Sequence, residues 1–186
     1  MAQKTVTSWK NKKVFQIVAP ENFDSQEIGE TVASDTSLLA GRTINVSLGE
    51  LTNDRSKNYM NIIFEVFEVN GNKVQTRFKR FFIPTGFLRS KVRKRTTKID
   101  FQRQFNIDDK KVKAKIMALS RYKVSEVQRA QIKAGIRGVI DEHMRLGLEK
   151  FVQEALFGKL GTDIYKRIKS TCPILRVEVY SIEVLR

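Results

Sequence analysis

The sequence predicts an α+β fold: a mostly antiparallel β-sheet or barrel built from two or more hairpins, then a C-terminal helical segment and a returning final strand. Three observations in the 186 residues support this prediction. Runs rich in β-branched and aromatic residues fill the first two thirds of the chain. Turn residues separate pairs of these runs, and apolar residues recur at helical spacing only after residue 124. Strands followed by helices are typical of α+β proteins.

Strand signals dominate residues 13–120. Lys13–Ala19 is a short apolar run stopped by Pro20, and Arg42–Leu48 alternates polar with apolar residues and is rich in β-branched ones. Both runs therefore predict strands. Between them, the acidic capping pattern of Asp24–Thr31 predicts one turn of helix.

The strongest local signal is a hairpin. Tyr59–Val69 and Lys73–Ile83 are rich in β-branched and aromatic residues and flank Asn70-Gly71-Asn72. Asn and Gly tolerate positive φ, so they favour a tight hairpin turn. Alternation on the second strand predicts one packed face and one face presenting cations. The packed face would hold Val74, Thr76, Phe78 and Arg80, and the other face Lys73, Gln75, Arg77, Lys79 and Phe81.

A short helix and a second hairpin follow. Pro84-Thr85-Gly86 ends the strand, and the residues after it suit a helix through Arg95, with Arg89, Lys91, Arg93, Lys94 and Arg95 on its outer side. Thr97–Phe105 and Val112–Leu119 predict a hairpin around Asn106–Asp109. In its second strand, Lys113 and Lys115 alternate with apolar residues, so one face is basic.

Helical spacing begins at a capping box, Ser125-x-x-Gln128, and a helix is predicted from there to Leu146. Its core stripe would hold Val127, Ile132, Ile136, Val139, Ile140 and Met144. Two shorter helices complete a helical region at 124–170, and Pro173 precedes the final strand at 174–185. No linker interrupts the pattern, so we predict a single domain over residues 1–186.

The charge of the chain is concentrated in its middle third. The net charge is +15, and residues 73–137 alone carry 20 Lys and Arg against 4 Asp and Glu. No acidic residue occurs between Glu68 and Asp100. A surface that only needs to be soluble mixes both signs. Ten cations without counter-charges therefore predict a polyanionic partner, with nucleic acid first and an anionic membrane second.

Few residues could carry out catalysis. His143 is the only histidine and Cys172 the only cysteine, which excludes an internal disulfide and disfavours a zinc site. No phosphate-binding glycine loop is present, so no cofactor or metal is expected. One alternative is a nucleic-acid-processing enzyme with a divalent metal on Asp100, Asp108 and Asp109. Another is a peripheral membrane protein that binds anionic lipid through the basic helix.

An RNA partner would be bound mainly through its phosphates. Lysine and arginine neutralise phosphates, and arginine adds a planar, bidentate geometry. The candidates from charge alone are Arg77, Lys79, Arg80, Arg89, Lys91, Arg93, Lys94, Arg95 and Lys98. Phe81-Phe82 and Trp9 are candidates for stacking on bases.

Several longer stretches resemble a known family. They are KNKKVFQIVAP at 10–20, IGETVASD at 28–35, GRTINVSLGELTND at 41–54, VNGNKVQTRFKRF at 69–81, FLRSKVRKRTTKID at 87–100 and FVQEALFGKLGTDIYKRIKSTCPILRVEV at 151–179. In order and content the chain resembles the archaeal and eukaryotic small-subunit ribosomal proteins of the "three-Ae" family, also called eukaryotic-type S-one. It is similar to the compact archaeal version, without long charged terminal extensions.

The resemblance implies a structural, non-catalytic protein of the small ribosomal subunit in the cytoplasm. It implies a place on the platform near the exit of the messenger RNA channel, with ribosomal RNA and neighbouring ribosomal proteins as partners and messenger RNA as a further candidate. It also implies RNA contacts by Lys10, Lys12 and Lys13 and by the segment Thr76–Lys79. In place of the aromatic pair that often follows the early lysines, this chain has Val14-Phe15.

Overall fold

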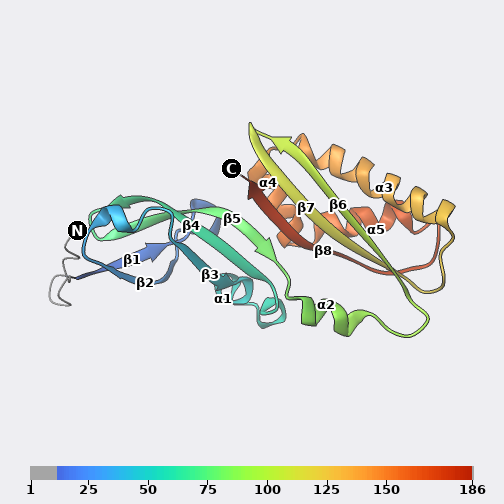
Figure 1. Cartoon of the computed structure of the whole chain (residues 1–186), viewed down its shortest axis with the longest axis horizontal. Helices are drawn as coiled ribbons and strands as arrows, with labels where there is room; N and C mark the ends of the chain where they lie inside the picture. Colours follow the sequence, from blue (N-terminus) through green and yellow to red (C-terminus); the bar gives the residue numbers. More distant parts are fainter. Residues whose placement is uncertain (1–11, 186) are drawn as a thin grey trace, which may run out of the picture. The chain divides into compact units, whose positions relative to one another are not determined.

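In the computed structural model, which describes residues 12–185, seven strands precede three consecutive helices and an eighth strand follows them (Figure 1). The strands are β1 (Lys13–Val18), β2 (Glu27–Ala33), β3 (Thr43–Ser47), β4 (Asn61–Asn70), β5 (Lys73–Phe82), β6 (Thr97–Ile107), β7 (Lys110–Ser120) and β8 (Ile174–Leu185). The helices are α1 (Leu48–Thr52), α2 (Thr85–Lys91), α3 (Glu126–Met144), α4 (Leu148–Leu156) and α5 (Lys159–Ile168). The predicted α+β class, the hairpins, the C-terminal helices and the final strand are confirmed.

The chain divides into two compact units, one ending at Lys79 and the other beginning at Arg80. We call them the N-terminal unit and the C-terminal unit. The boundary lies within β5, not at a linker. The expectation of a single domain over residues 1–186 stays a prediction.

The N-terminal unit is a five-stranded sheet with the order β2-β1-β5-β4-β3. Its pairings are antiparallel between β1 and β2 and between β3 and β4, and parallel between β1 and β5. Its core cluster contains the buried residues Phe15, Ile17, Ala33, Leu39, Val66 and Val74. On β4, the fully buried ring of Phe64 meets the ring of Phe23 edge to face, with the ring centroids 5.5 Å apart.

The helical turn predicted for Asp24–Thr31 is wrong. Asp24 and Ser25 have positive φ angles of 57° and 48°, which interrupt any helix there. The residues after them form β2, whose backbone pairs antiparallel with β1 from Lys13↔Ala33 to Val18↔Glu27. The acidic capping pattern is a local signal, and pairing of six β2 residues with β1 overrides it by giving backbone groups on that side of the strand hydrogen-bond partners.

The C-terminal unit has the strand order β5-β8-β7-β6, and every one of these pairings is antiparallel. Helices α3, α4 and α5 lie together on one side of this sheet (Figure 1). α3 and α5 approach closely at Gly135, where an added Cβ would lie 3.0 Å from the Ile168 side chain. A larger residue at Gly135 would therefore push the two helices apart.

The core stripe of α3 is largely as predicted. Ile132, Ile136, Val139 and Ile140 are buried. Val127 is 69% exposed, so its assignment to the core is wrong. It lies in the first turn of α3, next to the predicted capping box, which both Ser125 and Gln128 complete. Capping fixes where the helix starts but does not show which side chains of its first turn are buried.

Candidate nucleic-acid interface

The basic run from Arg89 to Lys98 combines a short helix, a turn and the start of a strand. α2 ends at Lys91, so the prediction of a helix extending to Arg95 is wrong. The Thr96 hydroxyl accepts from the backbone N–H of Arg93 and donates to the backbone carbonyl of Arg93, at 3.2 and 2.6 Å. These bonds compete with helix formation and close a turn at Arg93–Thr96. Arg95 has a φ of 71°, which is incompatible with a helix.

We call Arg89, Arg93, Lys94 and Arg95 the basic turn. All four side chains are exposed. Within residues 12–185, none of them forms an ion pair with a carboxylate. Four neighbouring cations without counter-charges create a local positive potential that attracts a polyanion.

Two other predicted cations of this run have partners within the protein. The Lys98 ammonium pairs with the Asp100 carboxylate at 2.8 Å. Lys91 is half-buried, and its ammonium lies 4.5 Å from the centre of the Phe87 ring. Both lysines are therefore less available to an RNA phosphate than the basic turn is.

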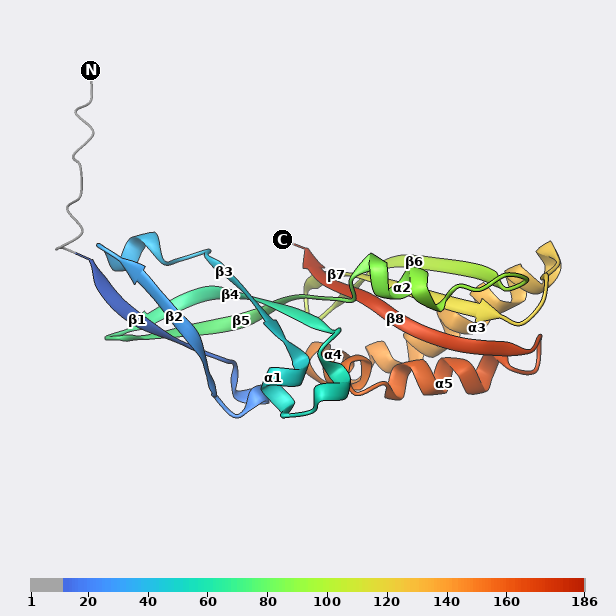
Figure 2. The same ribbon diagram turned by 90° about the horizontal axis from the view of Figure 1, so that it is seen from below.

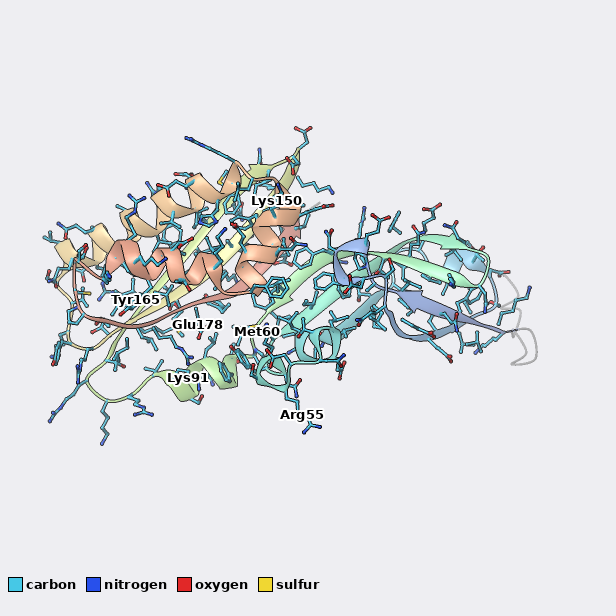
Figure 3. The ribbon with its side chains drawn as sticks, turned by 180° about the vertical axis from the view of Figure 1, so that it is seen from behind. Arg55, Met60, Lys91, Lys150, Tyr165 and Glu178 are labelled. Carbon is cyan, nitrogen blue, oxygen red and sulfur yellow. The ribbon has the colours of Figure 1, made fainter. Side chains whose placement is uncertain are left out.

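α2 has one buried side chain, that of Leu88. Figure 2 shows α2 and α5 on opposite sides of β8. Figure 3 labels Lys91 on α2 and Glu178 on β8. Burial raises the pKa of Glu178, and the positive charges of Arg176 and Lys91 oppose this shift. The docked helix fixes where the basic turn begins.

The cations of β5 are arranged around one buried acid. Glu65 on β4 is only 4% exposed, and its carboxylate accepts from the Arg77 guanidinium at 3.0 Å and from the Lys79 ammonium at 3.2 Å. Arg77 keeps 56% of its side chain exposed. The trio has a net charge of +1 and a fixed geometry. Sequence reasoning missed Glu65, although an acid in the apolar part of a strand that faces a basic strand is a usable signal.

At the start of the C-terminal unit, the predicted faces of β5 change. Phe81 was placed on the cation face but is fully buried, so it is excluded as a stacking platform. Arg80 was placed on the packed face, and it is half-buried with its guanidinium 5.3 Å from the centre of the half-buried Phe82 ring. The buried side of a strand depends on what packs against it, which alternation alone does not reveal.

At the start of the chain, Lys12 and Lys13 are exposed. Val14 is 47% exposed and Phe15 is buried in the core of the N-terminal unit. The other early candidates, Lys10 and Trp9, lie outside the described residues.

The three carboxylates of the metal-site alternative have separate structural roles. Asp100 pairs with Lys98. Asp108 and Asp109 form the two-residue turn between β6 and β7, with φ angles of 48° and 62° as a type I′ hairpin requires. Nowhere in residues 12–185 do three or more His, Cys, Asp or Glu side chains gather so that they could hold a metal ion.

Asp108 acts as a remote helix cap. Its carboxylate accepts from the backbone N–H of Leu148, at the first turn of α4, with a distance of 2.7 Å. We expect Asp108→Ala to lower the free energy of unfolding by about 1 kcal/mol, because this N–H loses its acceptor. Urea denaturation measures the change. Asp108→Asn keeps both an acceptor and tolerance of positive φ, so it should restore most of the loss; equal losses in both variants would contradict the capping role.

His143 lies in a buried polar cluster between α3, α4 and α5. It is 8% exposed, and its Nδ1 forms a hydrogen bond with the Glu154 carboxylate. Its Nε2 lies 3.5 Å from the Asp163 carboxylate. Lys159 donates to the other oxygen of Glu154 at 2.5 Å. Through His143, Glu154 and Asp163, this cluster joins three helices.

Across the described part of the chain, no helix combines the length and apolar character needed to cross a membrane. The helices instead pack one apolar side on a sheet and expose charged residues on the other.

Taken together, the fold and the exposed cations define a basic α+β protein with a surface suited to polyanions. The chain belongs to the Ribosomal S3Ae family, whose model matches residues 1–186. It is 37% identical to "Small ribosomal subunit protein eS1" of Archaeoglobus fulgidus, over 99% of this chain and 89% of the relative. The proteins of the same name from Methanobrevibacter smithii and Sulfurisphaera tokodaii are 32% and 33% identical, over 96% and 100% of this chain and 93% and 98% of theirs.

Proposed function

We propose that this protein is a structural component of the small ribosomal subunit in the cytoplasm and that it binds ribosomal RNA chiefly through the basic turn. The observation that carries the proposal is the exposure of four cations without ion-pair partners in the described residues. The curated relatives named as small-subunit proteins support it.

Arg77 contributes a second, weaker contact. Glu65 neutralises part of its charge but fixes the guanidinium, so that binding costs less side-chain entropy. Lys12, Lys13, Lys79, Arg80, Lys91 and Lys98 add to the positive field. Neighbouring ribosomal proteins, and messenger RNA near the channel exit, are the further partners that family membership suggests. The protein has a non-catalytic role in this proposal.

Binding of purified small-subunit ribosomal RNA across a salt series tests the proposal. If about eight phosphates are neutralised, the slope of log affinity against log salt should be roughly −6. The combined substitution Arg93→Ala, Lys94→Ala and Arg95→Ala should make that slope shallower by about two. These side chains are exposed, so the fold should persist.

The matched control instead removes two exposed cations from α3 and α4 and one from the C-cap of α5, by Lys133→Ala, Lys150→Ala and Lys169→Ala; Figure 3 labels Lys150. Its slope should change by less than one. A flat slope for the unsubstituted protein would overturn RNA binding as its function. Equal effects of the two triple variants would overturn the role of the basic turn.

A further inference from the structure

One face of the C-terminal sheet carries a ladder of lysine and amide side chains. Buried residues alternate with outward ones along β6 and in the first half of β7, up to Ile116, and Phe105 pairs with Val112 on the buried face toward the helices. From Ile116 to Ser120 all residues of β7 are buried, so the outward face is open only near the turn at Asp108. The outward residues are therefore on the face opposite α3, α4 and α5. They pair directly across the two strands as Asn106↔Lys111, Gln104↔Lys113 and Gln102↔Lys115. We call these six residues the amide–lysine ladder.

The ladder is positively charged and reachable. Its three amides and Lys111 are exposed, and Lys113 and Lys115 are half-buried. In the part of the chain that the structure describes, none of the three lysines pairs with a carboxylate. Glu183 on β8 lies opposite Lys113 in the register, and it is the acid nearest in register to the ladder.

The spacing of the ladder suits an extended ligand. Every second residue of a strand is about 7 Å further along, so the three lysines extend over about 13 Å. A single small anion cannot contact all three ammonium groups, whereas consecutive phosphates of a nucleic acid can. Each lysine stands beside an amide, which both donates and accepts hydrogen bonds. Such groups match the hydroxyls and base edges of single-stranded RNA.

We propose that the amide–lysine ladder is a second RNA-binding surface, which binds the sugar–phosphate backbone of ribosomal RNA. This inference rests on the proposed function and adds residues outside the acid-free stretch between Glu68 and Asp100. The basic turn precedes β6, and the ladder occupies the second half of β6, toward the turn at Asp108. β6 has eleven residues and is therefore about 35 Å long, so the two surfaces are separated by no more than about 35 Å along this strand.

The test substitutes Lys111→Gln, Lys113→Gln and Lys115→Gln together in the full chain. Its matched control is Lys133→Gln, Lys150→Gln and Lys169→Gln, which removes the same charge from the helices. With purified small-subunit ribosomal RNA, the ladder variant should make the salt slope shallower by about two, since about three phosphate contacts are lost. The control should change it by less than one. Circular dichroism melting shows that both variants are folded.

The outcomes separate the two proposals. If the slope of log affinity against log salt becomes shallower in the basic-turn variant but not in the ladder variant, only the ladder proposal is overturned. A flat slope for the unsubstituted protein overturns both. If the salt slope changes equally in the ladder and control variants, only the net charge affects binding, and the ladder proposal is also overturned. In assembled small subunits, a photoreactive group at position 104 should cross-link to RNA; cross-linking only to protein would assign the ladder to an acidic protein partner.

Discussion

Phe151→Ala should lower the free energy of unfolding of the C-terminal unit by about 3–5 kcal/mol, because it removes a large buried ring and leaves a cavity. Phe151 on α4 is fully buried, and its ring meets that of Phe105 on β6 edge to face, with centroids 5.5 Å apart. The contact joins the helices to the sheet. A loss of this size is a large part of the stability of an ordinary domain. Urea unfolding followed by circular dichroism measures it.

Phe157→Ala is the matched control, since Phe157 directly follows α4 and is 58% exposed. It should change the unfolding free energy by no more than about 0.5 kcal/mol. Similar losses in the two variants would contradict the packing argument. Amide hydrogen exchange of the Phe151→Ala variant also tests the single-domain prediction. If residues 1–186 unfold together, amides of β4 lose protection along with those of β7.

Glu154→Ala should cost about 1–2 kcal/mol at pH 7, because the variant leaves the buried Nδ1 of His143 without its partner, whereas the exposed Lys159 ammonium is hydrated by water instead. Burial raises the pKa of Glu154, but the hydrogen bonds from Lys159 and His143 outweigh it, and the net shift is downward. A carboxyl whose folded pKa is depressed contributes stability above its unfolded pKa, and that stability is lost as pH falls through the folded pKa.

The difference in stability between the unsubstituted protein and Glu154→Ala should therefore shrink as the pH is lowered from 7 toward 3. Chemical denaturation at a series of pH values measures it. Glu149→Ala is the control, because Glu149 is exposed in the first turn of the same helix and should change stability by about 0.5 kcal/mol or less. A Glu154→Ala difference that stays constant down to pH 3 would show that ionisation of this carboxyl does not stabilise the helical cluster.

Elements determined by local chemistry were predictable from the sequence. The turns at Asn70–Asn72 and Asp108-Asp109 define two hairpins, and Ser125 with Gln128 defines the start of α3. Elements determined by distant partners were not. β2 forms because β1 lies beside it, and no pattern within Asp24–Thr31 shows that pairing.

For the candidate interface, the sequence showed where the cations are concentrated but not which side chains meet across strands. Charge density located the basic turn, because a run of cations needs no tertiary context to be recognised. It did not show that Arg77 shares Glu65 with Lys79, since this depends on how two strands face each other. Nor did it show that Lys111, Lys113 and Lys115 line up against three amides, which follows from the register of β6 with β7.

The place of β8 in the sheet affects how the protein is made. β8 follows every other strand in the chain, yet it is inserted between β5 and β7. A nascent chain that has not reached residue 174 therefore has an open gap in the C-terminal sheet, with unpaired edges on both sides. The residues of the basic turn have already been synthesised at that stage, but the complete C-terminal sheet has not yet formed. Strand order thus makes closure of the C-terminal sheet depend on the last strand to be synthesised.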